Sequence, residues 1–83
     1  MRGNHHLDGE AVRVWLRRRG RFAYDLARAA GISEATVSKM INGRLGVSSA
    51  VVQAFADELG VTVDHLLTGT APRRLAAALV GAA

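Results

Sequence analysis

The sequence predicts a single all-α domain, and three features of its length and composition support this. With 83 residues, two independent cores would each be near the size at which a domain no longer folds alone. Apolar residues make up 49% of the chain, yet only four side chains are aromatic. Alanine, valine and leucine dominate instead, and this composition suits closely packed short helices better than a sheet, which is typically rich in bulky side chains.

Two helices are expected in the first third of the chain. The first follows Asp8, where apolar residues begin to recur at spacings of three and four, and it ends at Gly20. The second ends at Gly31, where a left-handed residue after the helix is expected. Its apolar stripe consists of Phe22, Leu26, Ala27 and Ala30. Residues 1–8, ahead of both helices, are polar and aperiodic and are interpreted as a flexible arm.

A third helix is expected to begin at Ser33 and end at Asn42, because the serine hydroxyl can cap the first turn. Its inner side carries Val37, Met40 and Ile41. Its outer side carries Ala35, Ser38, Lys39 and Asn42, which are small or polar. Two short helices joined by a tight glycine turn, the second with a small polar face, predict a helix-turn-helix whose second helix fits the major groove of DNA.

The remaining helices are shorter or less sharply marked. A fourth is expected to begin at Ser48 or Ser49, and a fifth is expected over Val63 to Leu67. The five helices together form one predicted domain over residues 9–69. Residues 70–83 have helical propensity but no partner face of their own, so they are expected to be a tail or a short oligomerisation helix.

Basic side chains are concentrated in the first half of the chain. Residues 1–44 carry nine basic and four acidic side chains, whereas residues 45–71 carry three acidic ones and no lysine or arginine. This asymmetry predicts a basic face that meets a polyanion and an acidic half turned away from it. The alternative is an ordinary scatter of surface charge.

The polar residues favour neither catalysis nor metal binding. The chain lacks cysteine, paired carboxylates, a nucleophile with a plausible base and a glycine-rich phosphate loop, so no enzyme activity, cofactor or small-molecule ligand is expected. His5 and His6 are adjacent but have no further ligand nearby, and His65 is expected on the surface. No apolar run approaches the roughly 20 residues that span a bilayer. A cytoplasmic, nucleoid-associated protein without membrane contact is therefore expected.

The segment LARAAGISEATVSKMINGR, followed by FADELGVTVDHLLTG, resembles the XRE family of helix-turn-helix DNA-binding proteins, the lambda repressor and Cro type. The resemblance implies a compact five-helix, lambda-repressor-like domain with the helix-turn-helix at the second and third helices. It further implies a transcriptional regulator, repressor- or Cro-like, that places Ser33 to Asn42 in the major groove of double-stranded DNA. The alternative is a protein-interaction module or antitoxin of the same fold, whose main contact is a partner protein.

The resemblance also implies two sets of contact residues. Base edges or adjacent phosphates are expected to meet Glu34, Ala35, Thr36, Ser38 and Lys39. The DNA backbone is expected to meet Arg21, Tyr24, Asn42 and Arg44. Simpler interpretations stay open for three of these, since Glu34 suits any helix N-terminus, Thr36 can complete the first turn, and Asn42 can end the helix. Arg17, Arg18 and Arg19 are expected to add only long-range attraction.

Two departures from the family pattern stand out. Ala23 occupies a position where relatives commonly carry a glutamine for a phosphate. Leu16 and Ile41 occupy the positions of a buried Arg-Glu pair, so an apolar contact replaces an ion pair, and such exchanges are often neutral or stabilising.

Regulators of this type usually bind as two-fold dimers, because one recognition helix touches too few base pairs. A homodimer on a pseudo-palindromic operator is therefore expected. Its interface stays open between the surface after the fourth helix, the fifth helix, and Leu75, Leu79 and Val80 in the tail.

Overall fold

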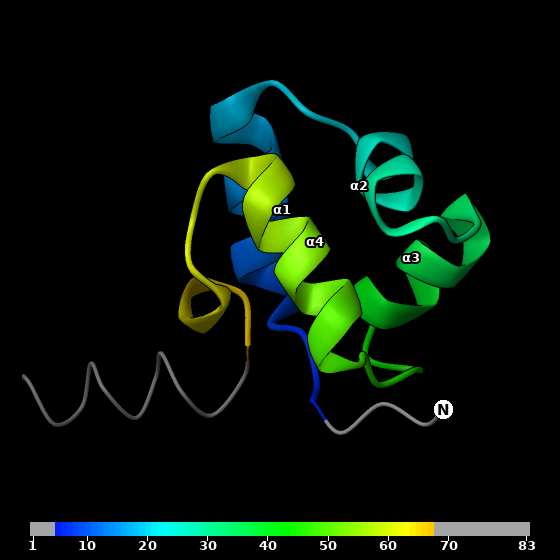
Figure 1. Ribbon diagram of the computed structural model, residues 1–83. Coiled ribbons are helices and arrows are strands. Elements are labelled where there is room, and N and C mark those ends of the chain that lie inside the picture. Colours follow the sequence, from blue (N-terminus) through cyan, green and yellow to red (C-terminus); the bar gives the residue numbers. More distant parts are fainter. Residues whose placement is uncertain (1–4, 68–83) are drawn as a thin grey trace, which may run out of the picture.

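The computed structural model describes residues 5–67, and this part of the chain is all-helical. Its elements are α1 (Gly9–Arg19), α2 (Ala23–Ala30), α3 (Glu34–Ile41), α4 (Ser49–Leu59) and one turn of 3-10 helix, η1 (Val63–His65). In Figure 1, α4 lies in front of α1, and α2 and α3 form a neighbouring pair on one side. The predicted all-α class is confirmed.

Side-chain caps start three of the helices. The Asp8 carboxylate accepts a hydrogen bond from Ala11 at 3.2 Å at the start of α1. The Ser33 and Ser48 hydroxyls accept from the backbone in the same way at the starts of α3 and α4. Ser48 rather than Ser49 is therefore the cap of α4. Gly31 follows α2 at φ 70°, and this left-handed conformation lets the chain turn into α3 within three residues.

The core is apolar throughout the described residues. It takes Val12 from α1, Leu26 from α2, Val37 from α3 and Phe55 from α4, and each of these side chains is fully buried. No polar or charged side chain is buried among residues 5–67. Leu16 and Ile41 both pack at this core, so the two positions where the family pattern has an ion pair are apolar in this structure.

The expected fifth helix is wrong: Val63 to Leu67 forms only a single 3-10 turn. Its hydrogen bonds join residues three apart, from the N–H of Leu66 to the carbonyl of Val63 and from that of His65 to Thr62. The Thr62 side chain is hydrogen-bonded to His65 Nδ1 at 2.8 Å and makes no cap. Leu67 is held in an antiparallel bridge, so the helix cannot continue.

The last part of the expected flexible arm is attached to the domain. Leu7 is only 3% exposed and belongs to the core, and it forms an antiparallel bridge with Leu67. His5 exchanges two backbone hydrogen bonds with Val47. The packed part of the chain therefore begins before residue 9, because the buried Leu7 side chain completes the core. Residues 1–4 and the expected tail or helix over 70–83 lie outside the described residues.

The start of α1 abuts the end of α3. A Cβ atom added at Gly9 would collide with the backbone carbonyl oxygen of Ile41. Only glycine therefore allows this approach, which fixes the position of α1 against α3.

Gly9→Ala is expected to destabilise the protein by about 1–3 kcal/mol, because the new methyl group must push α1 away from α3. At an unobstructed helix position the same change would stabilise by up to about 1 kcal/mol. Urea unfolding followed by the fluorescence of Trp15, the single tryptophan, measures the effect. Glu10→Ala at the neighbouring exposed position is the control, and equal or higher stability for Gly9→Ala would contradict the close packing.

Candidate nucleic-acid interface

The outer face of α3 is free of the core. Burial of Val37, Met40 and Ile41 turns the opposite side of the helix to solvent. That side exposes four of the expected base-edge residues, namely Glu34, Ala35, Ser38 and Lys39. The structure thus brings these four together on one exposed surface.

Thr36 differs from the other expected base-edge residues. It is half-buried, and its backbone N–H donates to Ser33 Oγ at 3.1 Å. The two hydroxyl groups of Thr36 and Ser33 are also hydrogen-bonded, at 2.8 Å. Thr36 therefore completes the first turn of α3, which is the simpler of the two interpretations.

Asn42 links the end of α3 to α1. Its Oδ1 accepts a hydrogen bond from Arg13 Nη2 at 2.8 Å, and its Nδ2 donates to Ser38 Oγ at 3.4 Å. Both ends of the amide are therefore engaged within the protein. Sequence reasoning did not single out Arg13, since it lies 29 positions before Asn42 and appears only as one more arginine on the polar side of a helix.

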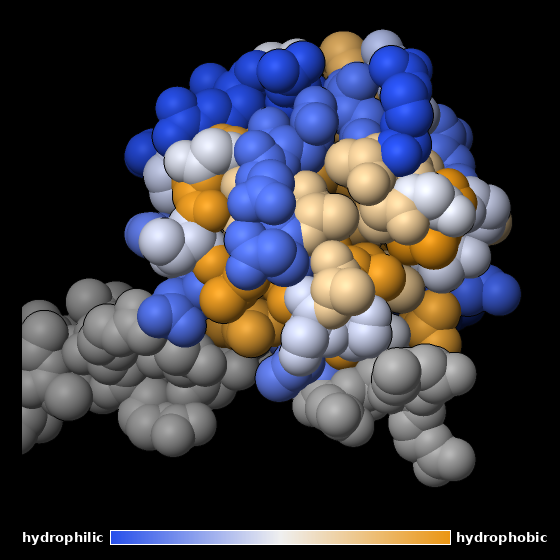
Figure 2. Space-filling view, viewed as in Figure 1, coloured by the Kyte–Doolittle hydropathy of each residue, from blue (hydrophilic) through white to orange (hydrophobic). Residues whose placement is uncertain are grey.

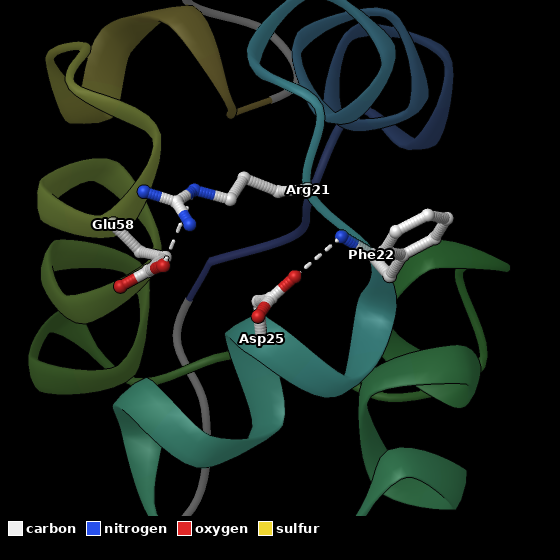
Figure 3. A network of polar contacts seen from close by, with 4 residues as sticks. All are labelled: Arg21, Phe22, Asp25 and Glu58. Atoms are coloured by element: carbon white, nitrogen blue, oxygen red, sulfur yellow. Dashed lines mark hydrogen bonds and ion pairs between the residues drawn. The ribbon is translucent and has the colours of Figure 1, made fainter.

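Arg21 points towards α4. Its Nε lies 3.5 Å from Glu58 Oε2, as Figure 3 shows. The side chains are 48% and 28% exposed, so the pair is well hydrated and adds little stability. Arg21, expected at a phosphate, thus has a carboxylate partner in the free protein.

A side-chain carboxylate from the first turn of α2 caps the start of this helix. Asp25 Oδ2 accepts a hydrogen bond from the N–H of Phe22 at 2.8 Å (Figure 3). Phe22 precedes the helix in an extended conformation and is 60% exposed, so its expected place on the apolar stripe of α2 is wrong. The Phe22 ring stacks on the Tyr24 ring with centroids 5.5 Å apart. The guanidinium group of Arg28 lies over the same Tyr24 ring.

The charged groups divide between the elements. The end of α1 and the connection to α2 carry arginines at positions 17, 18, 19 and 21, and Figure 2 shows hydrophilic side chains along this upper edge. Arg44 is exposed in the loop that follows α3. The acidic side chains of the second half, Asp57, Glu58 and Asp64, lie on α4 and η1.

The histidines of the described part have protein contacts. His5 Nε2 is hydrogen-bonded to Ser49 Oγ at 3.2 Å, and the exposed His65 packs edge-on against Trp15. No group of three potential metal ligands occurs within residues 5–67. No helix in that range is long and apolar enough to span a membrane.

Comparison with known proteins gives one family. The model of the Cro/C1-type HTH DNA-binding domain matches residues 12–71, which takes in most of α1 and everything through η1. A search of curated proteins found no match.

Ser33→Ala is expected to lower the free energy of unfolding by about 1 kcal/mol, because the N–H of Thr36 at the start of α3 loses its acceptor. Ser33→Asp restores an acceptor and is expected to recover most of this loss. Urea unfolding monitored by Trp15 fluorescence measures both variants. If Ser33→Ala unfolds at the wild-type urea concentration, the cap does not stabilise α3.

Proposed function

Because the chain belongs to the family of Cro/C1-type helix-turn-helix DNA-binding domains, we propose that it is a sequence-specific transcriptional regulator of the repressor or Cro kind. The segment Ser33 to Asn42 enters the major groove of double-stranded DNA. The observation that carries this proposal is the exposed outer face of α3, where small and polar side chains have no packing role in the protein. Such a regulator works at the chromosome, so we also propose a nucleoid-associated location.

Base readout is assigned to the four exposed side chains on the outer face of α3. Lys39 donates to guanine O6 or N7, and Ser38 contacts a neighbouring base. Glu34 accepts from cytosine N4, while the methyl group of Ala35 lets the helix approach the base edges closely. Lys39 and Glu34 have no polar side-chain partner within the described residues, so neither must break a bond on binding.

Backbone contacts fix the register of α3 in the groove. Arg44 and the hydroxyl of Tyr24 bond phosphates at either end of the helix-turn-helix. Arg21 joins them by exchanging the Glu58 carboxylate for a phosphate, which costs little because the ion pair is exposed. These contacts supply affinity and salt dependence but no direct sequence information.

Two copies are proposed to bind one operator. An eight-residue recognition helix contacts only a few base pairs, so high affinity requires a second half-site and a pseudo-palindromic sequence. The candidate interfaces are the surface after α4, the η1 turn and the tail, and the tail lies outside the described residues.

Selection from a random duplex library is expected to enrich one palindromic motif with the wild-type protein. The double variant Ser38→Ala and Lys39→Ala is expected to lose that enrichment at the corresponding base pairs, because each lost base contact removes about 1–3 kcal/mol of discrimination. Gln53→Ala, on the exposed side of α4, is the matched control and should select the wild-type motif. Absence of any motif from the wild-type protein would contradict the proposal and favour a partner protein as the main contact.

A further inference from the structure

An open hollow of about 550 Å³ lies between the second half of α1 and the start of α2. Its apolar part is formed by Leu16, Phe22 and Ala23. Gly20 and three arginines, namely Arg13, Arg17 and Arg21, complete the lining, and no acidic residue belongs to it.

Two of these arginines keep their positive charge uncompensated. Arg13 bonds the neutral amide of Asn42, and Arg17 has no polar side-chain partner within residues 5–67. Only Arg21 is paired with a carboxylate. Because no acidic residue lines the hollow, these two positive charges would attract an anion to its rim. The planar donor fork of arginine matches a phosphate in particular.

The hollow is connected to the outer face of α3. Arg13 bonds Asn42, and Asn42 bonds Ser38, so a chain of two hydrogen bonds runs from the rim of the hollow to the surface proposed to read bases. A DNA strand that flanks α3 would bring its phosphates alongside this rim. The apolar lining suits the sugar next to such a phosphate.

We propose that Arg13 and Arg17 clamp a phosphate of the DNA backbone in this hollow, with Asn42 as the positioning residue that holds Arg13. This inference rests on the proposed DNA-binding function. It assigns Asn42 an indirect role in place of the direct phosphate contact expected from the sequence, because both ends of its amide are already bonded. It also gives Arg17 a short-range contact in place of long-range attraction alone.

Two paired variants on α1 test the clamp. Arg13→Gln with Arg17→Gln removes two charges from the hollow, whereas Arg18→Gln with Arg19→Gln removes two charges that lie against Trp15 instead. Binding to the wild-type protein's selected duplex is measured at several salt concentrations. The double variant at Arg13 and Arg17, the hollow pair, is expected to bind at least about tenfold more weakly, and the slope of log affinity against log salt is expected to fall by about 1. The control pair at Arg18 and Arg19 is expected to show a clearly smaller change in affinity and in slope.

The outcomes separate this inference from the proposed function. The hollow pair should still select the wild-type motif, since a phosphate contact carries no sequence information. Equal losses for the two pairs would overturn the clamp and leave the regulator proposal standing. A hollow pair with wild-type affinity would also overturn it, and would leave the hollow available to an acidic protein. A wild-type protein that binds no duplex, even at low salt, would overturn both.

The role of Asn42 has its own measurement. Asn42→Ala is expected to weaken DNA binding when Arg13 is present and to have no further effect in the Arg13→Gln background, because it acts through Arg13. Additive losses would show that Asn42 contacts DNA itself. Urea unfolding of each variant, read from Trp15, verifies that the protein compared is folded, and Arg13→Lys should recover part of the affinity because it keeps the charge.

Discussion

Burial of one side of α3 is the constraint on which the candidate site depends. Val37, Met40 and Ile41 are each at most 9% exposed, and removing such side chains from water contributes about 1.5–3 kcal/mol apiece. Because these three residues lie on one side of an eight-residue helix, their burial fixes how α3 is rotated about its own axis. Ser38 and Lys39 must then face solvent. The surface proposed to read DNA is therefore fixed by apolar packing on the opposite side of the same helix.

The same packing brings α1 to the recognition helix. Gly9 allows the start of α1 to meet the carbonyl of Ile41, and one turn later Arg13 reaches Asn42. The first half of α1 thereby joins the surface of the helix-turn-helix although it is distant from α3 in sequence. The acidic side chains of the second half of the chain lie on α4 and η1, where Glu58 meets Arg21 at the border. The uneven charge of the chain thus becomes an uneven charge of the folded surface.

The sequence was sufficient where local signals decide the outcome. Ser33 as a cap, Gly31 as a stop and Val37 as a buried residue follow from hydrogen bonding, glycine conformation and helical spacing. Local patterns did not predict contacts between distant residues. Three such contacts depend on how the elements pack: the burial of Leu7, the hydrogen bond of Arg13 to Asn42, and the bridge at Leu67 that limits η1 to one turn. Phe22 was misplaced because its position before the helix removes it from the helical face.

The central claim is that α3 and residues 13–23, from the second half of α1 to the start of α2, form one DNA-binding surface. Backbone amide chemical shifts of the isotope-labelled protein, recorded during titration with its selected duplex, test this most directly. The account predicts that the largest changes fall on the outer face of α3 and along residues 13–23, while the exposed positions of α4 from Gln53 to Asp57 change little. Largest changes on α4 and η1, or no changes at low salt, would contradict it.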